Sequence, residues 1–347
     1  MPFTTAELAR VTDYALQTIS RKEPVDQITK SKPLLDYLLS TKEPSNFTGG
    51  VFRERVRVAN DSNYQNYFGR DQVTYNARDP MRLTSWGWSN FHDGFGYDED
   101  EMLAAGIILT DDSEAVATGA EKEILGNKLK ESHQALRDGV MEGLDKELHL
   151  DGTQNAKAAP GIDHIISTAP TTGTMGGIAR TFSWWQNNVN LGIASGTLLA
   201  EMEESWRAGS LFGGKVPGRI FVGSAFLDEY RKQVMTQNST QVNYVGGKGG
   251  VAVDGAVSEL TFHGVPIIWD PTLDQLDAEL GAGTYPRAKR AYFIPEGVIK
   301  LRPAKGHWML QRRPERLPDR YFHYWALTGK YALTTNKPNA TTVLSIA

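Results

Sequence analysis

The chain has 347 residues, 40% of them apolar, a composition that is typical of a globular protein with two or three lobes. Its 37 Lys and Arg against 41 Asp and Glu give a formal net charge of −4, which argues against a DNA-coating protein, because such proteins carry an excess of cations for the phosphates. The absence of cysteine excludes disulfides, thiolate metal sites and a cysteine nucleophile.

No segment is predicted to cross a membrane or to direct secretion. The longest apolar runs, such as residues 104–109 and 265–269, are far shorter than the roughly 20 residues that a membrane helix needs. Residues 1–10 lack the pattern of a signal peptide. We therefore expect no membrane association and a protein that stays in the cytosol where it is made.

Residues 1–50 are predicted to form an arm with little core of its own. Thr4 and Glu7 have capping-box spacing ahead of apolar residues at helical intervals, which predicts a short amphipathic helix over residues 4–20. Pro33 opens a second short apolar turn. Because so few apolar residues are available, we expect the arm to lean on another surface, and a partner's surface is favoured over a floppy terminus.

Residues 51–80 are predicted to form a long two-stranded loop with one basic face. The sequence alternates at the start of this segment and places Arg53, Arg55 and Arg57 on one side of a strand. A ribbon with so few aliphatic residues is marginally stable alone, so its order should come from a neighbour. The alternative is an ordinary edge hairpin that folds back on its own domain.

The longest predicted element is a helix over residues 113–148. Apolar residues recur there mostly at intervals of three, four or seven, no proline interrupts them, and Gly152 follows at the position of a left-handed cap. At ~1.5 Å per residue the helix would reach ~50 Å and would need a long surface to lie against. Just before it, the aromatic residues of 83–95 are predicted to pack beside the helix rather than to form a binding platform.

A compact α/β lobe is predicted to follow the long helix. The patterns indicate helices at 195–207 and 226–234 and strands at 219–223, 260–269, 291–294 and 298–301. Residues 330–335 and 341–346 are predicted to form an antiparallel hairpin that turns at 336–339 and joins a sheet beside the long helix.

We recognise no motif for catalysis, cofactor binding or metal binding. Residues 209–215 match G-x-x-x-x-G-K, but Val216 replaces the Ser or Thr that would hold magnesium, and the expected preceding element is a helix rather than a strand. The seven histidines never have the spacing that places two ligands on one helix face. His149 with Asp151, and Asp163 with His164, are read as solvated or capped turn residues that could still converge. We therefore expect no enzyme activity, cofactor or metal.

Short sequence features support the order of predicted elements described above. Gly161 and Ile162 follow the long helix, and residues 176–180 with Trp184 and Trp185 form a glycine-rich passage into the lobe. Residues 262–266 and 269–271 precede the strand at 292–294. With its arm, basic loop, long helix, lobe and return hairpin, the chain resembles the major capsid protein of tailed bacteriophages, which has the HK97-type fold.

The resemblance implies an α+β, HK97-like capsid fold with five segments. They are an N-arm at 1–50, an extended E-loop at 51–80, a P-domain at 81–190 with its spine helix at 113–148, an α/β A-domain at 191–295, and a C-terminal return to the P-domain at 296–347. It further implies a structural subunit that self-assembles as pentamers and hexamers into an icosahedral phage head enclosing double-stranded DNA. Such a virion protein would be assembled in the host cytoplasm.

The implied partners are further copies of the chain, a scaffolding protein, a portal, decoration proteins and packaged DNA without sequence-specific recognition. A separate scaffold is implied because no long helical segment precedes the arm. Within this reading, Arg53, Arg55 and Arg57 are expected to meet acidic residues of an adjacent subunit, either residues 98–101 or the Glu-rich face of the spine helix. The alternatives are an encapsulin-like bacterial nanocompartment shell and, less favoured, a cytosolic α/β enzyme.

Overall fold

The computed structural model describes residues 29–46, 49–98, 100, 119–211, 216–238, 260–312 and 322–347. The predicted helix at 4–20 and the first residues of the predicted spine helix lie outside this part of the chain. No helix within it is both long enough and apolar enough to span a bilayer.

The chain divides into two compact units. Asn90–Leu144 and Gly306–Lys330 belong to the first unit, whereas Ser31–Ser89, Asp145–Lys305 and Tyr331–Ala347 form the second. This division does not follow the five predicted segments, whose boundaries and names remain predictions.

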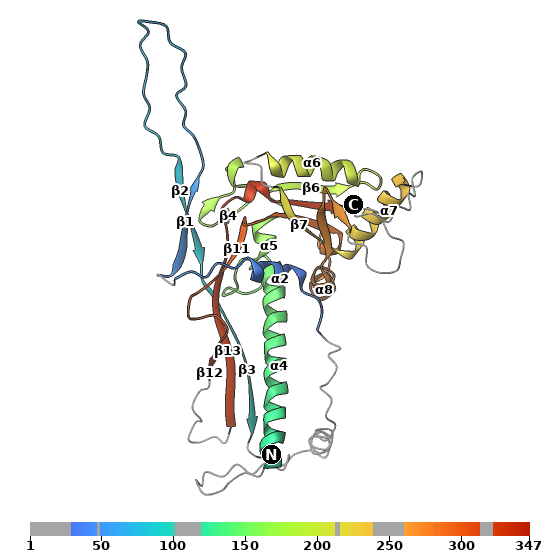
Figure 1. The fold of residues 1–347 in the computed structure, drawn as a ribbon. Helices are drawn as coiled ribbons and strands as arrows, with labels where there is room; N and C mark the ends of the chain where they lie inside the picture. Colours follow the sequence, from blue (N-terminus) through green and yellow to red (C-terminus); the bar gives the residue numbers. More distant parts are fainter. Residues whose placement is uncertain are drawn as a thin grey trace. The chain divides into compact units, whose positions relative to one another are not determined.

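A six-stranded sheet forms the core of the second unit (Figure 1). Its strands are, in order across the sheet, β6 (Asn188–Ile193), β14 (Thr342–Ile346), β10 (Arg290–Pro295), β7 (Pro217–Val222), β9 (Val265–Trp269) and β8 (Thr261–Phe262). The strands β10 and β14 are buried along almost their whole length, because both faces of the sheet are covered there. Side chains such as Phe293 and Leu344 pack there with Phe226 and Met202 of the covering helices.

Short helices surround this sheet. They are α2 (Pro33–Ser40), α5 (Ile162–Ile165), α6 (Leu198–Ser210), α7 (Ser224–Asn238) and α8 (Pro271–Leu280), with 3₁₀ turns η1 (Ser183–Trp185), η2 (Arg287–Lys289) and η3 (Pro338–Ala340). Helix α8 was not predicted, although the start of this helix carries a clear sequence signal. Asp270 is the N-cap, its carboxylate accepts a hydrogen bond from the Thr272 N–H, and Pro271 occupies the first turn.

The predicted C-terminal hairpin is wrong. The strand β13 (Phe322–Thr335) pairs with β3 (Ser89–Asp98), β11 (Ile299–Pro303) and β12 (Leu310–Arg312), whereas β14 lies between β10 and β6 in the other sheet. Four of the five residues of β14 are buried, on both faces of the strand. The turn η3 redirects the chain after β13, so that the two predicted hairpin strands enter different sheets.

The long helix is confirmed as α4 (Gly119–His149), whose 31 residues span about 45 Å. Leu136, Val140, Leu144 and Leu148 recur every four residues along it and are buried, as the predicted stripe requires. In the first unit, Leu136 and Val140 pack against Leu327 of β13 and against Phe91 and Phe95 of β3.

Val140→Pro should break α4. Proline removes a backbone donor and clashes with the preceding turn, at a cost of about 3 kcal/mol or more, and it also disturbs the packing of Val140 against Leu327. We expect a loss of far-UV helical signal and of soluble protein. Val140→Ala keeps the backbone donor and should retain the helix. Wild-type helical content in Val140→Pro would show that α4 is not continuous there.

The described part of the arm does not need a partner's surface, which corrects the sequence-based expectation. Leu34, Leu35 and Leu38 of α2 are at most 2% exposed and lie in the second unit of their own chain. The ring of Tyr37 packs 5.8 Å from that of Phe221 in β7. Sequence could not show this, because the covering residues lie far away along the chain.

Candidate functional site

The predicted basic loop contains a regular hairpin. Its strands β1 (Val51–Arg57) and β2 (Met81–Gly87) are antiparallel, and Arg57 lies opposite Met81. Exposed and half-buried residues alternate strictly along β1. Arg53, Arg55 and Arg57 therefore share the exposed face, as the periodicity predicted.

The opposite face of β1 is anchored to its own unit by Arg302 of β11. The Arg302 guanidinium lies 4.9 Å from the centre of the Phe52 ring and 3.7 Å from a carboxylate oxygen of Glu54. It also pairs with Glu43, which binds Lys300 as well. The hydrogen bond from Lys300, with Arg302 nearby, holds the pKa of the Glu43 carboxyl below its usual value. Arg302 thus joins the hairpin base to the segment that precedes it.

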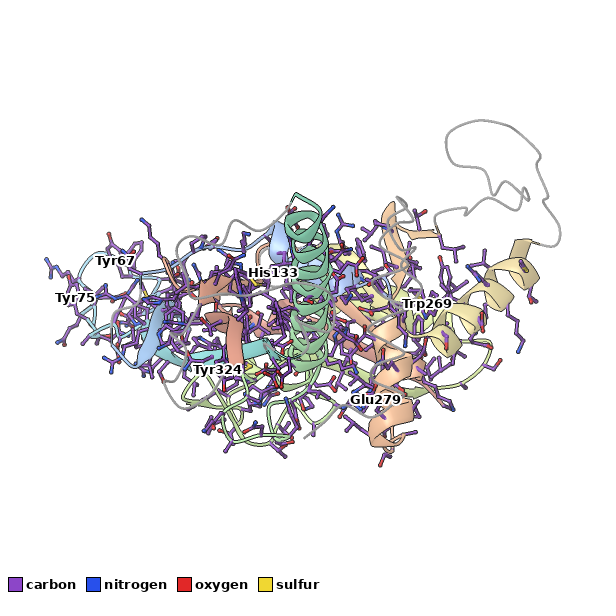
Figure 2. The ribbon with its side chains drawn as sticks, turned by 90° about the horizontal axis from the view of Figure 1, so that it is seen from below. Tyr67, Tyr75, His133, Trp269, Glu279 and Tyr324 are labelled. Atoms are coloured by element: carbon purple, nitrogen blue, oxygen red, sulfur yellow. The ribbon has the colours of Figure 1, made fainter. Side chains whose placement is uncertain are left out.

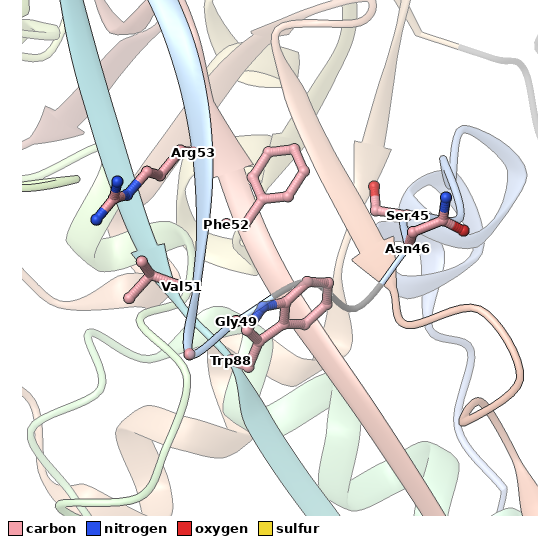
Figure 3. A pocket seen from close by; sticks show the side chains of 8 residues that line it. Ser45, Asn46, Gly49, Val51, Phe52, Arg53 and Trp88 are labelled. Carbon is pink, nitrogen blue, oxygen red and sulfur yellow. The ribbon is translucent and has the colours of Figure 1, made fainter.

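Two aromatic contacts complete this anchor. Trp88 packs edge-on against Phe52 at 6.2 Å, and Figure 3 shows Phe52 and Arg53 on opposite sides of β1. Trp86 is 2% exposed and lies over Gly176, where an added Cβ would come within 2.9 Å of the indole. Gly176 also has a φ of +56°, so both its space and its conformation require glycine. These two tryptophans pack on the hairpin base rather than beside the long helix as predicted.

The chain between the two strands of the hairpin is almost entirely exposed. Its large aromatic side chains are Tyr64 (84% exposed), Tyr67 (69%), Phe68 (88%) and Tyr75 (92%). Figure 2 shows Tyr67 and Tyr75 pointing away from the rest of the ribbon. Hydrogen bonds link the two sides of the loop, among them one from the Asn63 side-chain amide to the Thr74 carbonyl oxygen at 2.5 Å. Such a concentration of exposed aromatic surface marks an interaction site.

The exposed face of the hairpin combines free cations with apolar surface. Within the described part of the chain, Arg53 and Arg55 form no side-chain hydrogen bond or ion pair, and Arg57 donates only to Asn60, at 2.7 Å. Met81 and Leu83, opposite Arg57 and Arg55, are about half exposed. These two residues were not predicted as part of the face, although their alternation in β2 places them on the same side as the arginines.

Of the histidine and aspartate pairs considered above, Asp151 is an exposed, capped turn residue as predicted, because its carboxylate accepts hydrogen bonds from Thr153, whereas His149 and Asp163 are not solvated. His149 is buried, with Nε2 at 3.0 Å from an Asp270 carboxylate oxygen and Nδ1 at 2.7 Å from the Asp145 carbonyl oxygen. Burial alone lowers the pKa of His149, but the hydrogen bond and charge of Asp270, with Asp145, raise it to about 9. Asp163 accepts hydrogen bonds from Arg290 and Tyr292. Both clusters are buried structural networks.

No described residues form a cluster of three or more side chains suited to hold a metal. The segment 209–215 begins at the C-terminal end of α6, as expected from the sequence, and residues 212–215 lie outside the described chain. A phosphate loop would instead follow a strand.

No protein-family model and no curated protein matches the chain. Solved structures do match it along nearly its whole length. The cyanophage A-1(L) capsid has a TM-score of 0.61 at 15% identity over 93% of this chain and 96% of that one. The capsid of Myoviridae phage XM1 has a TM-score of 0.56 at 10% identity, covering 94% and 95%. The SrpI encapsulin complex of Synechococcus elongatus has a TM-score of 0.51 at 11% identity, covering 99% and 96%.

Proposed function

Because the chain has the HK97-type capsid fold, we propose that it is the major capsid protein of a tailed bacteriophage. Copies of it assemble as pentamers and hexamers into an icosahedral head around double-stranded DNA, and the role is structural rather than enzymatic. A scaffolding protein, a portal and decoration proteins would be its other partners. Assembly would take place in the host cytoplasm. The net charge of −4 suits a wall that must not trap the DNA moving beside it.

The exposed hairpin loop is the observation that carries this proposal. A monomeric protein would leave four large aromatic rings, two half-exposed apolar side chains and unpaired arginines in water. A neighbouring subunit would cover them, and its contact would also order a ribbon that has no core of its own.

A bacterial nanocompartment shell is the second candidate, because the encapsulin match covers 99% of this chain. The two candidates share self-assembly and differ in what the shell contains. Particles that protect DNA from nuclease favour a phage head, and particles that enclose a protein cargo favour a nanocompartment.

Purified protein, expressed alone and together with a scaffolding protein of the same phage, tests the proposal. Negative-stain electron microscopy and light scattering should show rings or closed shells. A stable monomer under both conditions would overturn the proposal and its nanocompartment alternative together.

Replacing Arg53, Arg55 and Arg57 with Glu should lower particle yield without changing the far-UV circular dichroism. These side chains lie outside any core, and their reversal would place like charges across the contact. A single exposed pair contributes only about 0–1 kcal/mol, so one substitution should do little. The triple variant Arg207→Glu, Arg231→Glu and Lys305→Glu changes the charge equally at other exposed positions. Unchanged yield and salt sensitivity in the β1 variant would favour a simple edge hairpin.

A further inference from the structure

A second, much shorter hairpin lies against the base of the β1–β2 hairpin in the second unit (Figure 1). Its strands are β4 (Thr174–Met175) and β5 (Ile178–Ala179), and they are joined by Gly176 and Gly177, whose φ angles are +56° and +76°. A two-residue turn of this kind needs positive φ at both positions, which glycine adopts without strain. The tip of the short hairpin therefore carries no side chain, and its backbone can approach a neighbouring strand closely.

This tip touches β2 at two adjacent residues. The Gly176 carbonyl oxygen accepts a hydrogen bond from the Ser85 N–H at 2.8 Å, and the ring of Trp86 lies over Gly176. A Cβ at Gly177 would come within 2.6 Å of the Ser85 hydroxyl oxygen. Because the Ser85 N–H bonds to Gly176, it points away from β1, and the short hairpin holds the edge of β2 that β1 does not cover.

The short hairpin is itself fixed by buried side chains. The guanidinium of Arg180, which is 2% exposed, donates to the carbonyl oxygen of His164 and, at 3.3 Å, to the side-chain oxygen of Asn187. It also lies 3.3 Å from the sulfur of Met175, whose carbonyl oxygen accepts a hydrogen bond from the Trp185 indole at 2.8 Å. Since its base is fixed in this way, the short hairpin can hold β2 in place rather than follow it.

The β1–β2 hairpin is thus attached to its unit at two separate points. Arg302 holds β1 through Phe52 and Glu54, and the short hairpin holds β2. One attachment alone would leave the ribbon able to turn about it. At ~3.3 Å per residue, the roughly 11 residues on each side of the segment 58–80 reach up to ~35 Å, so a turn of about 10° at the base moves the end of the loop by about 6 Å.

We propose that the β4–β5 hairpin is a clamp that sets the direction of the β1–β2 hairpin within the isolated subunit, before any neighbour binds. A loop that already has its direction loses less conformational entropy when it meets another subunit, which favours assembly. This consequence for shells rests on the proposed function. The clamp itself does not, because both hairpins belong to one unit of one chain.

Gly177→Ala, with and without Ser85→Ala, tests the clamp by hydrogen exchange of dissociated subunits. The added methyl group would meet the Ser85 hydroxyl, so the amides of β1 and β2 should exchange about tenfold faster, which corresponds to a loss of about 1.4 kcal/mol. Ser85→Ala in the same chain removes that hydroxyl, leaves the nearest side-chain carbon at 3.8 Å, and should restore protection. Ser85→Ala alone should exchange like the wild type, because the hydrogen bond from its N–H remains.

Gly173→Ala is the matched control for backbone strain. Gly173 lies just before β4, has a φ of +80°, and has no atom within 4 Å of its Cβ position. Alanine is therefore strained there in the same way but meets nothing on β2, and the exchange of β1 and β2 should not change. Faster exchange in this control, unchanged exchange in Gly177→Ala, or failure of Ser85→Ala to restore protection would each overturn the clamp.

Light scattering during shell assembly measures the consequence for the proposed function. Gly177→Ala should assemble more slowly than the wild type, and the variant that also carries Ser85→Ala should recover. Equal assembly rates despite faster exchange in Gly177→Ala would overturn the role of the clamp in assembly. If the wild type forms no shells while the exchange results hold, the proposed function fails and the clamp stands.

Discussion

Gly161→Ala is expected to destabilise the folded subunit severely. A Cβ at this position would lie 2.3 Å from the Leu150 carbonyl oxygen, 2.4 Å from that of Leu148 and 2.7 Å from that of Glu147. All three oxygens belong to the backbone at the end of α4, so none can move away by a side-chain rotation. We expect a loss of about 3 kcal/mol or more, at the upper end of the usual cost of overpacking.

Gly143→Ala is the matched control, because it also replaces a glycine with alanine and so adds one methyl group, in this case within α4. No atom lies within 4 Å of the position of its Cβ. Alanine in a helix interior is favoured over glycine by roughly 0.5–1 kcal/mol, so this variant should be slightly more stable than the wild type. Urea unfolding of dissociated subunits measures both. Wild-type stability in Gly161→Ala would mean that the chain after α4 does not press against the helix end.

The contrast between these glycines shows what the sequence could predict. Gly152 follows an apolar stripe, and its left-handed role could be anticipated because a cap depends on neighbouring residues; its φ is +89°. Gly161 appeared only as one of several glycines in a passage. Gly161 must be glycine because the turn of the chain brings it close to the backbone carbonyl groups at the end of α4. No local sequence pattern indicates that contact.

The same reasoning separates confirmed elements from missed ones. Periodicity predicted α4, α6, α7 and the alternation of β1, because each depends on residues a few positions apart. The place of β14 depends on β6 and β10, and the role of Arg302 depends on Glu43, 259 positions away. Of the candidate interface, the sequence therefore predicted the arginine face, but not its anchor.

The stability of the subunit should fall as the pH rises from about 6.5 to 9. His149 is the last residue of α4, and its ring lies between the carboxylates of Asp145 and Asp270. The pKa of the His149 imidazole is about 9 in the folded state, against an ordinary value of 6.5. Because the folded state binds this proton more tightly, the stabilisation is complete below pH 6.5 and is lost as the pH passes 9. The difference of about 2.5 pH units corresponds to about 3 kcal/mol.

Two carboxylates face His149, one from its own helix and one from the start of α8. Asp145, one turn earlier in α4, has its pKa raised, chiefly by burial, so its contribution changes on the acid side. Asp270, on the other side, is fully buried and caps α8 with its second oxygen. Deprotonation of His149 would leave these two carboxylates close together without a cation between them, which is why the loss should be large.

His149→Gln isolates this contribution, because glutamine can donate a hydrogen bond to Asp270 but cannot carry a charge. Urea unfolding of dissociated subunits at several pH values between 6 and 10 measures the slope for each protein. The variant should be less stable than the wild type at pH 6.5 and should lose little further stability as the pH rises. By pH 9.5 the two proteins should approach each other. Parallel losses in wild type and variant would show that His149 is neutral in the fold, and that the cluster is held by hydrogen bonds without an ion pair.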